Sequence, residues 1–189
     1  MDVIAKEILD FWFIETTPEQ KFKRSDEFDK KIENKFLVYY KKAIKGEYDN
    51  WKKDPDECLA LIILFDQFSR NLFRSNPKAF EMDMQCSMIS KFAIKHDYHK
   101  KLPVEKIFFI FLPLMHSENL DDQILCKKLI EMHLQDHTGF KDIKKFAIIH
   151  HDIIAEFGRF PYRNKVLGRK NTKKEDEYLH SKHFDFFNI

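Results

Sequence analysis

Asp66 and Arg70 are charged residues on a helical stripe that is otherwise apolar, continuing from Leu59 at three- and four-residue spacing. Burying a lone carboxylate is very costly, so Asp66 needs a cation, and Arg70 lies one helical turn further on. Gln67 and Asn71 repeat the same spacing and are candidate ligand contacts. Two interpretations stay open: a pocket wall in which Asp66 is an acid or base, or an internal ion pair that fixes helix packing.

Two histidines are further candidates for acid–base chemistry. His116 follows the apolar run Ile107 to Met115 and precedes the start of a helix, where the neutral ring is favoured. We expect Ser117 to be the N-cap of that helix and Glu118 to interact with the positive end of its dipole. Glu118 is also a candidate ligand contact. His150 shares a helical stripe with apolar residues and is expected to face inward. The alternative is that both histidines are structural.

An arginine-bearing loop follows the helix that contains His150. Gly158 is expected to end that helix in a left-handed conformation. Arg159, Arg163 and Asn164 come next, between aromatic residues. Because a guanidinium offers paired donors to a carboxylate or phosphate, these three residues predict an anion-binding loop. Alternatively, Arg163 pairs with Asp66 or Glu118 and holds the C-terminal half in place.

Metal and cofactor sites have little support in the sequence. His133 and His137 stand four residues apart, a spacing that can chelate a metal, but a helix C-terminus favours histidine anyway. His116, Glu118 and His150 form a two-histidine, one-carboxylate set that no spacing enforces. The phosphate-loop, dinucleotide-binding, nucleophile-elbow and zinc-protease motifs do not occur. We therefore predict neither a metal nor a cofactor.

Helices must position these residues. The chain has only four Gly and six Pro, too few turn formers for a sheet-rich fold, and helical periodicity dominates. We predict a single all-α domain over residues 1–189, with about seven to eight helices joined by short connections. The expected segments are Val3 to Phe13, Asp26 to Lys45, Asp54 through Phe65, Asn76 to Lys95, a helix from Pro103 that Pro113 kinks or ends, Ser117 to Gln135, Gly139 to Phe157, and Lys173 to His183.

Charge and composition exclude several classes of partner. The net charge of +2 arises from interleaved acids and bases, so we expect no nucleic-acid or membrane partner. The longest apolar run is too short to cross a bilayer, and the N-terminus does not resemble a secretory signal. Three widely spaced cysteines are typical of a reducing compartment. These features predict a cytoplasmic protein.

The same clusters support a family resemblance. The segments are LALIILFDQFSRNLFR (59–74), IFLPLMHSENLDDQ (110–123), HHDIIAEFGRFPYRNKVLGR (150–169) and the opening ILDFWF (8–13). In these segments the chain resembles the bacterial domain-of-unknown-function family 924, although Ser69 replaces an expected Pro and Tyr162 an expected His. The resemblance implies a tetratricopeptide-like stack of α–α hairpins and brings no activity, so function must be argued from the site.

Two functional hypotheses follow. In the first, the polar clusters converge on a pocket for a small anionic ligand bearing phosphate or carboxylate, and the protein is an enzyme or a binding protein. In the second, a tetratricopeptide-like groove binds a peptide or partner protein. The apolar C-terminal residues 184–189 also leave a homodimer open.

Overall fold

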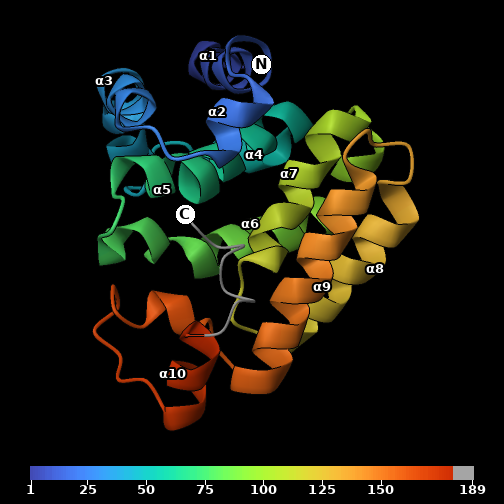
Figure 1. Cartoon of the computed structure of the whole chain (residues 1–189). Helices are drawn as coiled ribbons and strands as arrows, with labels where there is room; N and C mark the ends of the chain where they lie inside the picture. Colours follow the sequence, from blue (N-terminus) through green and yellow to red (C-terminus); the bar gives the residue numbers. More distant parts are fainter. Residues whose placement is uncertain (181–189) are drawn as a thin grey trace.

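A computed structural model describes residues 1–180, which form an all-α fold without strands in that part of the chain (Figure 1). In chain order, the α-helices are α1 (Val3–Asp10), α2 (Pro18–Phe22), α3 (Asp26–Ala43), α4 (Pro55–Ile62), α5 (Ser69–Leu72), α6 (Asp83–Lys95), α7 (Val104–Met115), α8 (Leu120–His133), α9 (Phe140–Phe157) and α10 (Lys173–Leu179). Two π-helical segments, η1 (Phe11–Glu15) and η3 (Ile63–Phe68), continue α1 and α4. The 3₁₀ turns are η2 (Asp49–Lys53), η4 (Pro77–Phe80), η5 (Tyr98–Lys100) and η6 (Pro161–Arg163).

Capping residues explain where several helices begin and end. The Asp54 side chain accepts two backbone N–H groups at the start of α4, where Pro55 occupies the first turn. Thr172 and Glu175 form a reciprocal capping box on α10. Gly158 ends α9 with a φ of 68°, a conformation that favours glycine. The starts of α4 and α10 and the end of α9 therefore follow from capping residues next to them in the sequence.

The helices form two neighbouring groups (Figure 1). Helices α7, α8 and α9 pack side by side, with α8 contacting both neighbours. On the other side, α1 packs against α4 and α3 against α5, while α6 contacts both α4 and α7. One apolar core extends through these elements from Ala5 to Ala147. Helix α10 and the preceding loop lie beyond the end of α9, below α6 in Figure 1.

The two π-helical segments meet through aromatic side chains. Phe68 is fully buried, and its ring centroid lies 5.9 Å from that of Phe11 and 5.6 Å from that of Trp12. All six residues of η3 are buried. The preceding α4 is also buried at five consecutive positions, 58–62, so this stretch of helix is enclosed on all sides, and the consecutive polar residues Asp66 and Gln67 both lie inside the protein.

Several predicted boundaries are wrong in detail. The predicted helix from Asn76 to Lys95 is two elements, η4 and α6. Pro113 lies inside α7, which ends two residues later at Met115. The N-cap of α8 is Asn119 rather than Ser117, because the Asn119 side chain accepts the N–H groups of Asp121 and Asp122. Pro18 begins the short helix α2, which the prediction did not include.

No helix among the described residues has both the length and the apolar character needed to cross a membrane. The cytoplasmic location and the single domain over 1–189 stay predictions. Residues 184–189 and the predicted end of the last helix at His183 lie outside the described residues.

Candidate functional site

The Asp66 carboxylate and the His116 imidazole form a hydrogen-bonded pair. Asp66 is brought inward by η3, with 1% of its surface exposed, and His116 follows the last residue of α7. The His116 Nδ1 atom lies 2.7 Å from Oδ1 of Asp66. Gln67 donates its side-chain amide to Oδ2 of the same carboxylate at 2.5 Å. Asp66 is therefore held from both oxygens, and it orients the His116 ring.

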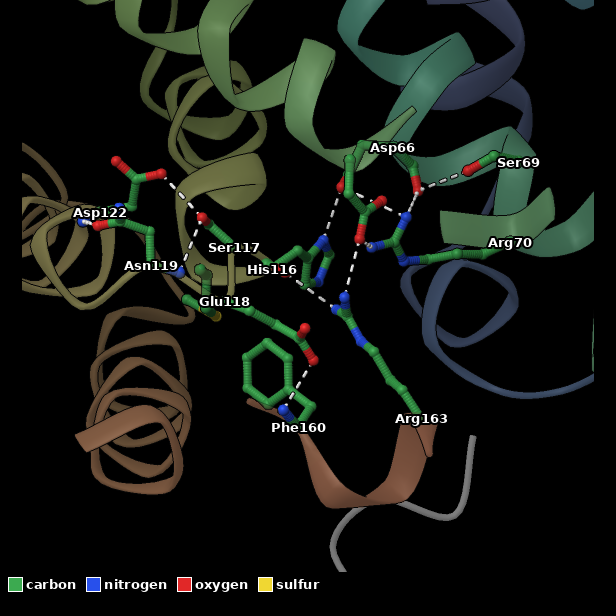
Figure 2. A network of polar contacts seen from close by, with 12 residues as sticks. Asp66, Ser69, Arg70, His116, Ser117, Glu118, Asn119, Asp122, Phe160 and Arg163 are labelled. Atoms are coloured by element: carbon green, nitrogen blue, oxygen red, sulfur yellow. Dashed lines mark hydrogen bonds and ion pairs between the residues drawn. The ribbon is translucent and has the colours of Figure 1, made fainter. Parts of the chain in front are cut away.

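Two arginines surround this pair, Arg70 from the same helical segment as Asp66 and Arg163 from the C-terminal part of the chain (Figure 2). Arg70 donates to the Asp66 carbonyl oxygen at 2.7 Å and to Oδ2 of Asp83 at 3.1 Å. Arg163, which ends η6, donates to the same Asp83 oxygen at 2.9 Å and to the His116 carbonyl oxygen at 3.0 Å. Its guanidinium lies over the ring of Phe80, 4.6 Å from the centroid. Asp83 therefore bridges Arg70 and Arg163.

The charges of this network balance without a charge on His116. Burial would raise the pKa of Asp66, but the Arg70 charge and the hydrogen bonds from His116 and Gln67 outweigh burial and hold it below its usual range. Burial lowers the pKa of His116 despite the opposing effect of Asp66. Two carboxylates and two guanidiniums already neutralise one another, so the neutral imidazole fits here. Because a carboxylate only accepts, Nδ1 carries the proton and Nε2 keeps a free lone pair.

The second ring nitrogen of His116 is available for chemistry. Within residues 1–180, Nε2 makes no hydrogen bond, and the His116 side chain keeps 17% of its surface exposed. Figure 2 shows this nitrogen pointing away from Asp66, on the side where Arg163 and Glu118 lie. The arrangement is that of a general base held by a carboxylate.

His150 lies close to this pair but is more deeply buried. The centroids of the His150 and His116 rings are 6.2 Å apart, and Nδ1 of His150 lies 2.8 Å from the Phe146 carbonyl oxygen. Burial, with the neighbouring His116 ring, lowers the pKa of His150 to about 3. His150 is therefore neutral at physiological pH and contributes packing next to Phe160, whose ring centroid lies 5.5 Å away.

A surface cleft of about 490 Å³ reaches His116. One wall is the exposed face of α6, and the other is the loop that joins α7 to α8. The cleft is lined by Pro77, Phe80, Glu81, Asp83, Met84, Ser87, Met88, Lys91, His116, Ser117, Glu118, Asn119, Asp122, Arg163 and Leu167. Its volume is in the range of small-molecule sites.

Most charges on the cleft wall already have partners within the protein. These ion pairs are Arg163 with Asp83, Lys91 with Asp122, and Arg169 with Glu118. Glu118 also accepts the backbone N–H of Phe160 at 2.8 Å. Burial opposes ionisation of Glu118, but the Arg169 hydrogen bonds lower its pKa overall. The remaining charged residue on the lining is Glu81, which has no ion pair among the described residues.

Besides Asp66 and His150, two arginine and two asparagine candidates from the sequence lie outside the cleft lining. Arg70 donates hydrogen bonds to Asp66 and Asp83. Arg159 makes a paired contact with Glu175 at 2.6 and 2.8 Å. The remaining two are amides that bond within the protein, Asn71 to Asp29 and Asn164 to Asn171. Gln67 is also absent from the lining. His116, Glu118 and Arg163 are the sequence candidates that reach the cleft.

Sequence reasoning missed Asp83 and Arg169. An acidic residue in the first turn of a helix has an ordinary explanation in the helix dipole, so Asp83 gave no signal. Arg169 lies beyond the aromatic loop and pairs with Glu118 at 2.7 Å. In the sequence, the one feature that points to Arg169 is the concentration of arginines in residues 159–169.

The described residues contain no group of three His, Cys, Asp or Glu side chains that could hold a metal ion. His133 instead contacts the ring of His99, and Nδ1 of His137 accepts the backbone N–H of Gly139.

Comparison with known proteins gives a family and one solved relative. The family described as "Bacterial protein of unknown function (DUF924)" matches residues 8–183. The structure of the protein of unknown function ATU0120 from Agrobacterium tumefaciens is 30% identical in sequence and superposes with a TM-score of 0.85. That match covers 94% of this chain and 97% of the other. No protein with a curated description matches. The all-α fold is thus shared with a protein whose function is also open.

Proposed function

The chain belongs to the DUF924 family of bacterial proteins of unknown function, and we propose that its cleft is a small-molecule site in which His116 acts as a general base. The observation that carries this proposal is the Asp66–His116 pair. A buried carboxylate fixes one ring nitrogen, and the other is left with a lone pair beside the cleft. Asp66 is a positioning residue in this proposal, and Gln67 holds Asp66.

The anionic ligand expected from the sequence stays a prediction, and the geometry favours it less. An anion clamp needs guanidinium donors that point into the pocket. Arg163 donates to Asp83 and to a carbonyl oxygen, and Arg70 and Arg159 donate to other protein oxygens. The peptide-binding adaptor also stays a prediction.

Diethyl pyrocarbonate tests the proposal, because it acylates an unprotonated and accessible imidazole nitrogen. With peptide mass spectrometry as readout, we expect His116 to react at neutral pH and the buried His150 to be protected. Asp66→Asn should slow the reaction at His116 several-fold, because an amide can donate to Nδ1 and move the proton to Nε2.

Asp29→Asn is a matched control, since Asp29 is also an arginine-paired carboxylate, 15% exposed, but lies outside the cleft. It should leave the reactivity of His116 unchanged. A His116 that stays unmodified while the exposed His96 reacts, or that responds equally to both variants, would refute the general-base role.

A further inference from the structure

Helix α6 has a second apolar face, which the rest of residues 1–180 leaves exposed. Its inner face, which includes Cys86 and Ile89, is buried, and α6 contacts α4 and α7. On the outside, Met84 and Met88 are 77% and 62% exposed, and Phe92 is 36% exposed. These three side chains recur every four residues and therefore form one row on the helix. Single exposed apolar residues are ordinary, but a contiguous row is typical of a protein–protein interface.

A charged residue extends this row at each end. Glu81 precedes Met84 by three residues, and Lys95 follows Phe92 by three. Both are exposed, and neither forms an ion pair within the part of the chain that the structure describes. Glu81 lines the cleft together with Met84 and Met88, so it lies on the same side of α6 as they do. We call the row from Glu81 to Lys95 the outer stripe.

The outer stripe is complementary to its own reverse. Its members lie three and four residues on either side of Met88 in the same order, and its two ends carry opposite charges. When two α6 helices lie antiparallel with Met88 at the centre, Met84 faces Phe92 of the partner subunit. Glu81 then faces Lys95 of the partner subunit. A parallel pair would instead place like charges opposite each other, which is unfavourable.

We infer that a second copy of this chain packs on the outer stripe, α6 antiparallel to α6, in a twofold homodimer. Such an interface requires reciprocal contacts, and the reversed symmetry of the stripe supplies them. A different partner protein would not require this symmetry. From Glu81 to Lys95 the stripe is roughly 20 Å long, so the interface is small and we expect a reversible dimer in the micromolar range.

The dimer also adds to the cleft. Because Met84 lines the cleft, the partner subunit's Phe92 contributes an apolar side chain to the rim of the cleft. The inferred interface does not rest on the general-base role of His116, and a failure of one leaves the other standing.

Disulfide crosslinking tests the central contact. In the full chain with Met88→Cys, the twofold axis brings the two introduced thiols together, and we expect a covalent dimer after mild oxidation with copper phenanthroline. Met132→Cys is the matched control, since Met132 is 60% exposed but lies on α8, outside the stripe. It should stay monomeric on a non-reducing gel. The native cysteines are all buried and are not expected to crosslink.

Charge reversal tests the antiparallel direction. Sedimentation equilibrium over a micromolar concentration series gives the dissociation constant of the dimer. We expect Glu81→Lys and Lys95→Glu each to weaken the dimer about tenfold, because each variant places like charges opposite each other. The variant with both reversals re-forms the two ion pairs with opposite polarity, and its dissociation constant should return to within about threefold of wild type.

A wild-type chain that stays monomeric throughout the concentration series would overturn the inference. So would a dimer that Met88→Cys does not crosslink, or one that the double reversal fails to restore. Such a dimer would form through another surface, for which residues 184–189 are the candidate from the sequence.

Discussion

At the scale of single residues, Asp66 is the buried charge on which the network depends. It lies against Arg70, with a carboxylate oxygen 3.5 Å from Nη1, in addition to its bonds to His116 and Gln67. Removing one partner of a buried ion pair leaves the other charge uncompensated. The pair is thus both a structural element and the support of the proposed base.

We expect Asp66→Ala to lower the free energy of unfolding by roughly 3–5 kcal/mol, as measured by urea denaturation. Asp10→Ala is the matched control, because Asp10 forms an ion pair with Lys6 at the same four-residue spacing on the surface. That pair should contribute less than about 1 kcal/mol. Equal losses in the two variants would contradict the buried network.

His150 predicts how stability depends on pH. Its pKa is about 3 in the folded protein, against an ordinary value near 6.5 in the unfolded chain. The unfolded chain therefore binds a proton that the folded protein does not, so stability falls as pH drops from about 6.5 toward 3.

Between pH 7 and pH 5 we expect this residue alone to lower the free energy of unfolding by about 2 kcal/mol. Urea denaturation at both pH values, on wild type and on His150→Gln, measures the difference. The variant should lose less stability over this interval, and an identical loss would show that other groups carry the effect.

At the scale of elements, the π-helical segment η3 places Asp66. Its last residue, Phe68, contacts the rings of Phe11 and Phe36, the latter at 4.7 Å between centroids. The position of the Asp66–His116 pair therefore depends on aromatic packing one residue beyond Gln67.

Phe68→Ala should cost about 3–5 kcal/mol of stability, because it removes a fully buried ring from a close-packed core. Phe22→Ala is the control at a side chain that is 61% exposed, and its effect should stay within about 0.5 kcal/mol. Urea denaturation gives both values. A small loss for Phe68→Ala would mean that the contact between the π-helical segments is dispensable.

At the scale of the whole molecule, Arg163 joins the C-terminal segment to the rest of the fold. Its two terminal nitrogens reach α6 through Asp83 and the end of α7 through the His116 carbonyl oxygen. The side chain is only 5% exposed. A single lysine ammonium cannot reproduce this two-pronged contact.

We therefore expect Arg163→Lys to behave like Arg163→Ala and to raise amide hydrogen exchange across residues 159–180 at least tenfold. Arg24→Lys, in an exposed ion pair, should leave exchange there unchanged. Wild-type exchange in Arg163→Lys would show that charge alone holds the segment.

The sequence by itself determined the all-α class, most of the helices and the inward position of Asp66 and His150. These properties follow from local rules: caps, proline and glycine positions, and the spacing of apolar residues along one helix. Helical spacing also identified Arg70 as a nearby cation for Asp66. The family resemblance is confirmed by the match over residues 8–183.

Only the tertiary structure decided which polar groups meet. His116 comes 50 residues after Asp66, and Arg163 comes 80 residues after Asp83. Periodicity along one helix carries no information about which side chain of another helix lies opposite. The arginines illustrate this limit. Guanidinium groups in an aromatic loop predicted an anion-binding site, whereas in the folded chain Arg159 and Arg163 donate to carboxylate and carbonyl oxygens of the protein. The cleft at His116 forms where α6 and the loop after α7 lie next to each other. The sequence of either segment taken by itself does not predict that contact.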